Sequence, residues 1–195
     1  MHRLAASFVL GYHGCDRGTG ESLLKGEPFR PSANDYDWLG PGVYFWEANP
    51  QRGLEFARES SKRRNSAIQQ PFVVGAVIEL GLCLDLTTSG GIGLVKMAYR
   101  ALYESTSAAA GPLPTNSADL LRRPLDCAVM RRVHSILQQT GYSAVDTVRG
   151  LFTEGDPIYP GAGFREKTHV QIAVCNPACI KGVFRVPAEE FQRLA

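Results

Sequence analysis

Two glycine-flanked segments near the N-terminus carry the side chains best suited to hold a ligand. The first places His13, Gly14 and Cys15 at the end of a short apolar run. A histidine exposes ring nitrogens there, and the bare backbone of a glycine lets its N–H and C=O groups hold a carboxamide. The second segment places Tyr44 just after a Gly-Pro-Gly turn, where an aromatic ring could stack on a planar heterocycle. Together they predict a pocket for a flat ring that bears an amide.

Taken singly, these residues have a more ordinary interpretation. A lone histidine is usually a surface residue or a satisfied core residue, and an aromatic run such as Tyr44-Phe45-Trp46 is more often core packing than a ligand platform. The order of the motifs along the chain is what favours a function.

The rest of the chain predicts an α+β fold that positions these residues. Apolar, β-branched runs predict strands, and helical spacing with caps predicts helices. The strands are expected at 8–12, 43–46, 72–80, 144–149, 170–174 and 180–186, and the helices at 21–25, 50–64, 94–105 and 126–139. Because strands and helices do not alternate strictly, the order favours α+β over a parallel doubly wound sheet. The length of 195 residues predicts a single domain over 1–195.

Charge and cysteine content exclude several classes of protein. The 21 Lys and Arg residues against 19 Asp and Glu give a net charge of +2, too small for bulk attraction to nucleic acid or a membrane. Five cysteines predict neither a disulfide framework nor a four-ligand zinc site, and no metal is expected. The N-terminus lacks a secretory signal, and no apolar run approaches the roughly 20 residues that span a bilayer, so a cytoplasmic location without membrane partners is expected.

In this order the motifs resemble those of the ADP-ribosyltransferase superfamily, in its poly(ADP-ribose) polymerase-like and diphtheria-toxin-like branch. The family pattern is a His-Gly-Ser/Thr strand end, a Gly-x-Gly-Ile-Tyr-Phe strand, a helix and an apolar strand ending in glycine. The sequence matches these features at 13–15, 39–45, 50–60 and 73–81. The clear match covers residues 8–81, and a weaker one extends to 171–184.

The resemblance implies a split, mostly antiparallel β-fold with peripheral helices and a central cleft for NAD⁺, which would be the substrate. It implies that His13 binds the adenine-side ribose, that Gly14 clamps the nicotinamide amide and that Tyr44 stacks on the nicotinamide ring. Cys15 takes the Ser/Thr place of the family triplet, where its sulfur would bond the amide weakly. Arg30 falls where the family often lines the adenine side.

The sequence departs from the family at one catalytic position. The family places a glutamate at the start of a late strand, where it binds the nicotinamide-side ribose and opposes the positive charge that forms as nicotinamide leaves. Here Gln171 takes that position, and strand alternation points His169 to the same face. Three explanations stay open: Glu154 supplies the carboxylate, Glu166 supplies it, or Gln171 acts with binding geometry alone.

The function implied by the resemblance is that of a stand-alone bacterial mono-ADP-ribosyltransferase. It would pass single ADP-ribose units to a protein or nucleic acid, because chain elongation tends to accompany the missing glutamate, and residues 155–168 lie where the family places its acceptor-recognition loop. Such chains often act as toxins or defence effectors, which would imply an antitoxin or immunity partner. Two alternatives remain: an NAD⁺ glycohydrolase that uses water as acceptor, and a non-catalytic module that binds NAD⁺ or ADP-ribose, which the glutamine favours.

Overall fold

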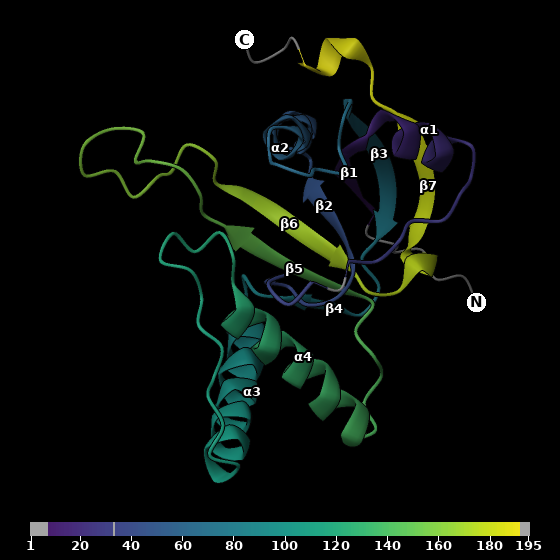
Figure 1. Ribbon diagram of the computed structural model, residues 1–195. Helices are drawn as coiled ribbons and strands as arrows, with labels where there is room; N and C mark the ends of the chain where they lie inside the picture. Colours follow the sequence, from purple (N-terminus) through teal and green to yellow (C-terminus); the bar gives the residue numbers. More distant parts are fainter. Residues whose placement is uncertain (1–7, 33, 192–195) are drawn as a thin grey trace.

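A computed structural model describes residues 8–32 and 34–191, and this part of the chain forms one seven-stranded sheet with four α-helices (Figure 1). The strands are β1 (Phe8–Asp16), β2 (Val43–Glu47), β3 (Pro71–Glu79), β4 (Cys83–Asp85), β5 (Thr147–Phe152), β6 (His169–Val174) and β7 (Ile180–Arg185). The helices are α1 (Arg17–Leu24), α2 (Pro50–Ser61), α3 (Ser89–Ala108) and α4 (Pro124–Gln139). Every strand pair is antiparallel except β4 with β5. The predicted α+β class and mostly antiparallel sheet are confirmed.

The sheet consists of two parts that are joined only briefly. Its strand order is β4-β5-β6-β2-β1-β3-β7. β1 pairs with β3 along its whole length, from Phe8 to Asp16, but with β2 only at Gly11 and Tyr12. No backbone pair between β1 and β2 follows Tyr12, so the two strands separate beyond this residue. The sheet therefore opens at its middle, between β1 and β2.

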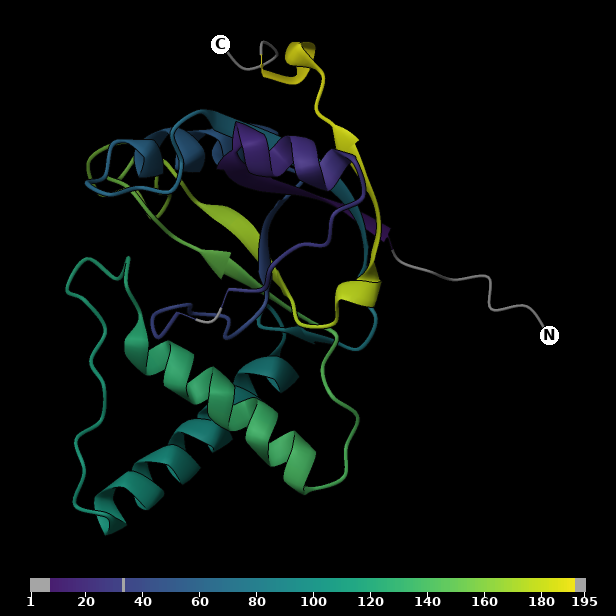
Figure 2. The same cartoon turned by 45° about the vertical axis from the view of Figure 1, so that its right-hand side comes forward.

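The helices cover different parts of this sheet. α1 and α2 lie against β1 and β3, while α3 and α4 pack on each other and against the β4–β5 side, as both views show (Figure 1, Figure 2). The core under the second helix pair contains Val129, Met130 and Val133 of α4, packed with Val148 and Ala173 of the sheet. No helix in the described ranges has the length and apolar content that a membrane span requires.

Local chemistry explains why α2 begins where it does. The side chain of Asn49 accepts a hydrogen bond from the backbone N–H of Arg52 at 2.9 Å, and Pro50 occupies the first helical position. Asparagine satisfies an orphan N–H at a helix start, and the fixed φ of proline suits the first turn. The predicted start at 50 is confirmed, although the helix ends at Ser61 rather than near 64. This cap sets the position of the helix that lines the site.

Several elements differ from the sequence prediction. β1 continues to Asp16 instead of ending at residue 12, so His13 and Gly14 lie within the strand. α1 begins at Arg17 instead of residue 21, and β5 spans Thr147–Phe152 instead of 144–149.

α3 begins at Ser89, five residues before the predicted start, because the hydroxyl of Thr88 caps it by accepting from Gly91 N at 3.1 Å. The glycines of its first turn have poor helix propensity and concealed this start. β4 was not predicted, since it has only three residues and forms through its parallel pairing with β5.

Candidate functional site

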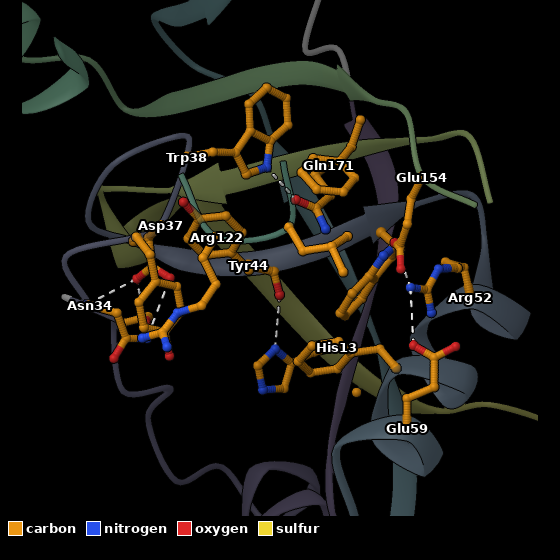
Figure 3. Close-up of a pocket in the computed structure, with 18 of the residues that line it drawn as sticks. His13, Asn34, Asp37, Trp38, Tyr44, Arg52, Glu59, Arg122, Glu154 and Gln171 are labelled. Carbon is orange, nitrogen blue, oxygen red and sulfur yellow. Dashed lines mark hydrogen bonds and ion pairs between the residues drawn. The ribbon is translucent and has the colours of Figure 1, made fainter. Parts of the chain in front are cut away.

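A cavity of about 680 Å³ lies where β1 and β2 separate (Figure 3). Its wall combines the ends of both strands, one side of α2, the loop from Arg30 to Gly42, residues 119–122 and the ends of β5 and β6. Six site residues predicted from the sequence line this cavity: His13, Gly14, Arg30, Tyr44, Glu154 and Gln171. Segments more than 150 positions apart therefore meet at one cavity.

The backbone of Gly14 is open toward this cavity. On the same edge of β1, the carbonyl of Leu10 accepts from the N–H of Ala48 at 2.8 Å, just beyond β2. Every second residue of a strand points its N–H and C=O to the same side, so Gly14 also points both groups toward β2. The next ladder partner in this register would be Tyr44, but the strands have separated there. The backbone N–H and C=O of Gly14 that point toward β2 therefore have no partner on that strand.

The imidazole of His13 fills part of the gap between the two strands. Its Nδ1 lies 2.9 Å from the carbonyl oxygen of Tyr44. Because a carbonyl can only accept, Nδ1 carries the proton and donates it. Burial lowers the pKa of His13, so the ring stays neutral and Nε2 keeps its lone pair. His13 therefore offers a hydrogen-bond acceptor that suits a hydroxyl group.

The phenol of Tyr44 is tied to the turn that precedes β2. Its hydroxyl accepts from the N–H of Leu39 at 3.0 Å and donates to the carbonyl of Gly40 at 2.9 Å. Burial raises the pKa of Tyr44 above its ordinary value, so the phenol remains protonated. The ring packs beside the core cluster that includes Leu39. Tyr44 lines the cavity as expected, but both of its hydrogen-bonding functions are already used.

The aromatic ring beside Gly14 belongs to α2. A Cβ atom on Gly14 would overlap the carbonyl oxygen of Gly53 and would lie 3.3 Å from Cδ1 of Phe56. The ring of Phe56 also lines the cavity and packs on Trp46, with ring centroids 4.8 Å apart. Gly14 is thus a glycine because α2 approaches β1 closely. Phe56 was not among the site residues predicted from the sequence.

One side of α2 lines the cavity with a repeating pattern. Arg52, Phe56 and Glu59 recur at intervals of four and three residues, which places them on one helix face. Arg63 lines the cavity two residues after the helix ends. Together these four residues present a cation, an aromatic ring, an anion and a second cation in turn. None of them was among the predicted site residues, because the sequence did not show which face of the helix borders the cavity.

Gln171 lines the cavity with its amide in a fixed orientation. Its Oε1 accepts from the indole N–H of Trp38 at 2.6 Å. Since an indole N–H can only donate, the amide oxygen must face Trp38 and the amide nitrogen is the free end, which is the arrangement drawn in Figure 3. In the sheet, Gln171 lies opposite Trp46 of β2. Gln171 therefore supplies donors to the cavity and no negative charge.

Glu154 belongs to a cluster of four charged side chains, of which Glu154, Arg52 and Glu59 line the cavity (Figure 3). Its Oε2 lies 2.8 Å from Nη2 of Arg52, and its Oε1 lies 3.8 Å from Nζ of Lys167. Glu59 completes the cluster, 3.4 Å from Arg52 and 2.9 Å from Lys167. The hydrogen bond to Glu59 raises the pKa of Lys167, so this amine stays charged. The cluster contains two positive and two negative groups.

Two of the predicted binding residues do not line the cavity. Cys15 is buried against Gly20 of α1, and burial raises the pKa of its thiol to about 12. His169 is 5% exposed and lies behind the rings of Trp46 and Phe152, at centroid distances of 6.2 and 5.4 Å. Burial lowers the pKa of His169 and keeps it neutral. Both residues contribute to packing around the site.

The remaining acidic candidate lies apart from the cavity as well. Glu166 is exposed, and its backbone N–H bonds to the carbonyl of Asp156 within the 155–168 loop. Arg30, in contrast, lines the cavity with an exposed side chain that has no ion-pair partner in the described part of the chain. Of the two glutamates proposed as substitutes for the family carboxylate, only Glu154 is at the cavity.

Comparisons with other proteins add a relative but no function. An uncharacterized protein of Methanocaldococcus jannaschii is 27% identical over 189 residues, which covers 87% of this chain and 83% of that protein. No family model matches the chain, and no solved structure matches it. The similarity extends over most of both chains and is not confined to the glycine-flanked motifs.

Proposed function

We propose that the chain is an NAD⁺-dependent mono-ADP-ribosyltransferase, which breaks the nicotinamide–ribose bond and transfers one ADP-ribose to a protein or nucleic acid. The observation that carries the proposal is the open backbone of Gly14 beside the ring of Phe56. Nicotinamide is a flat ring with a carboxamide, whose NH₂ donates and whose C=O accepts. It can pair with both groups of Gly14 and stack on Phe56. The sheet that opens between β1 and β2 supports an ADP-ribosyltransferase type of fold.

The other half of NAD⁺ would occupy the His13 end of the cavity. The neutral Nε2 of His13 can accept a proton from a hydroxyl of the adenine-side ribose. Arg30 lines the cavity and is available to the adenine side. The cavity volume of about 680 Å³ lies within the range of small-molecule sites. In this arrangement Tyr44 shapes the wall, and Phe56 is the stacking ring.

The chemistry would depend on charge placed near the ribose. As the bond between C1′ and the ring nitrogen breaks, its electron pair neutralises the nicotinamide, and positive charge develops on the ribose. Glu154 is the carboxylate at the cavity that can oppose this charge, and the free amide of Gln171 can hold a ribose oxygen. The acceptor atom then donates an electron pair to form its bond to C1′ and releases its proton to water. Because Arg52 lies 2.8 Å from Glu154, it offsets part of the carboxylate's effect, and we expect slow turnover.

One observation favours a second candidate, a module that binds NAD⁺ or ADP-ribose without turnover. Gln171 brings no charge, and Glu154 is paired with both Arg52 and Lys167. If these pairs persist when the ligand binds, little negative charge remains to stabilise the ribose cation. Binding would then be retained and bond cleavage lost.

The test follows both products of the reaction. The full chain is incubated with NAD⁺ labelled in its adenylate phosphate, and free nicotinamide and label on protein or nucleic acid are measured. We expect both to appear for the natural protein, and neither for His13→Ala. Label only in free ADP-ribose would indicate a glycohydrolase. NAD⁺ binding in calorimetry without nicotinamide release would indicate the binding module, and absence of binding would refute the proposed site.

A further inference from the structure

Arg52 has buried hydrogen-bond donors that the protein itself does not use. The residue is 5% exposed, and its Nη2 bonds to Glu154 at 2.8 Å and to Glu59 at 3.4 Å. Its Nε and Nη1 are buried without a hydrogen-bond partner within residues 8–32 and 34–191. A buried donor without an acceptor costs about 1–3 kcal/mol, and more for a charged group. Since Arg52 lines the cavity, a ligand is the natural source of the missing acceptors.

Donors from two other elements lie on the same part of the wall. The indole Nε1 of Trp46 is also buried without a partner in the described chain, and Trp46 lines the cavity. Its ring lies below the start of α2, because a Cβ on Gly53 would be 3.6 Å from Cε3 of Trp46. Gln171, opposite Trp46 in the sheet, adds its free amide nitrogen. This part of the cavity therefore requires a ligand rich in acceptor oxygens.

The charge of the cluster determines which oxygens fit. Arg52 and Lys167 are balanced by Glu59 and Glu154. An anionic group such as a phosphate would meet two carboxylates without a net positive charge to attract it. A pair of neutral hydroxyls meets no such repulsion: one hydroxyl can donate to Glu154 while its neighbour accepts from Arg52. The cluster thus matches a vicinal diol, which needs an acceptor and a donor side by side.

We propose that Arg52 and Glu154 together bind the 2′- and 3′-hydroxyls of the ribose that carries nicotinamide. The proposal rests on the NAD⁺ site described above. Arg52 precedes Gly53, which covers Gly14, and it lies one helical turn before Phe56. A sugar attached to a ring that pairs with the backbone of Gly14 and stacks on Phe56 therefore lies close to Arg52. The carboxylate absent from position 171 is supplied from the end of β5, and Arg52 makes the site specific for a ribose diol.

The test changes the ligand first, so that it does not depend on any variant. Binding of NAD⁺ and of two analogues, which lack the 2′- or the 3′-hydroxyl on the nicotinamide-side ribose, is measured by calorimetry with the full chain. A hydrogen bond to a charged group is worth about 1.5–3 kcal/mol, so removing one weakens binding about 10- to 100-fold. We expect this loss for both analogues.

The second step assigns the loss to Arg52. In Arg52→Gln we expect NAD⁺ to bind about 10- to 100-fold more weakly, and the discrimination against one of the two analogues to disappear. Arg58→Gln is the matched control, because Arg58 lies on α2, is exposed and does not line the cavity. It should keep the affinities of the natural protein. Glu154→Gln, which retains a polar group of similar size, should remove the discrimination against the other analogue.

Three results would separate the two proposals. Analogues that bind the natural protein as tightly as NAD⁺ would overturn the diol assignment and leave the proposed NAD⁺ site standing. Full discrimination by a folded Arg52→Gln protein would also overturn it, because another group would then hold the hydroxyl. If Arg52→Gln does not fold, Glu154→Gln decides in the same way. Absence of NAD⁺ binding by the natural protein would refute the site itself and the diol assignment with it.

Discussion

The hydrogen bond between Trp38 and Gln171 determines which end of the amide faces the cavity, and its strength can be measured without any ligand. Trp38→Phe removes the indole N–H, and the amide oxygen of Gln171 loses the partner it has at 2.6 Å. The phenylalanine ring keeps part of the stacking on Phe152, whose centroid lies 5.3 Å from that of Trp38, and on Arg123, whose guanidinium carbon lies 5.0 Å from the ring. The main loss is therefore the hydrogen bond and some packing volume.

These contributions set the expected magnitude. The orphaned amide costs about 1–2 kcal/mol and the smaller ring about 1 kcal/mol, so Trp38→Phe should lower the free energy of unfolding by about 2–3 kcal/mol. Gln171→Met removes the amide and leaves the indole N–H unpaired, at a cost of about 1–2 kcal/mol. In the double variant both polar partners are absent. Its loss should be smaller than the sum of the single losses by about 1 kcal/mol.

Urea unfolding of the four proteins at one pH measures this coupling. Gln139→Met is the matched control, because Gln139 ends α4 and its amide bonds to Ser135 instead of Trp38; combined with Trp38→Phe it should be additive. A Trp38→Phe, Gln171→Met pair that is additive within about 0.3–0.5 kcal/mol would show that the bond contributes nothing. The amide of Gln171 would then have no fixed orientation, and its nitrogen would no longer be assigned as a free donor to the cavity.

The other predictions concern pH, stacking and the helix cap. Burial lowers the pKa of His13, His134 and His169, so these histidines bind protons more readily in the unfolded chain than in the folded one. The free energy of unfolding should therefore fall as the pH drops below about 6.5, by up to 1.4 kcal/mol per pH unit for each histidine. A free energy of unfolding that stays constant between pH 7 and 5 would contradict this. Phe56→Leu should weaken NAD⁺ binding about threefold to tenfold in calorimetry through lost stacking, and it should lower the free energy of unfolding by about 1 kcal/mol because the ring contact with Trp46 is lost. Asn49→Ala should cost about 1 kcal/mol in urea unfolding by removing the α2 cap, and Asn49→Ser should restore most of it.

Local signals in the sequence were sufficient for several elements. The β-branched run at 72–80 predicts a strand with neighbours on both sides, and β3 pairs with both β1 and β7. Asn49 followed by Pro50 predicts a helix start, and the cap forms as expected. These predictions hold because a few adjacent residues determine the result, through backbone preference or a hydrogen bond two or three positions away.

The composition of the cavity could not be predicted in the same way. Arg52 and Phe56 belong to it because α2 packs on Gly14, and Gly14 is open because β1 and β2 separate after two paired positions. The length of a ladder depends on tertiary packing, which no single segment encodes. His169 is the opposite case: strand alternation places it on the same face as Gln171, but the rings of Trp46 and Phe152 cover it and it does not line the cavity.

The charge of the cavity wall explains why position 171 is a glutamine while position 154 is a glutamate. Both line the cavity, and a carboxylate at each position would add like charge to a wall where Glu59 already contributes. Arg52 and Lys167 pair with the two glutamates of the cluster, and the amide oxygen of Gln171 accepts from the neutral indole of Trp38. A carboxylate at position 171 would be repelled by these two glutamates, which costs stability in the folded chain. With Glu154 just beyond the end of β5, an uncharged amide at 171 adds no negative charge and still leaves a free hydrogen-bond donor in the cavity.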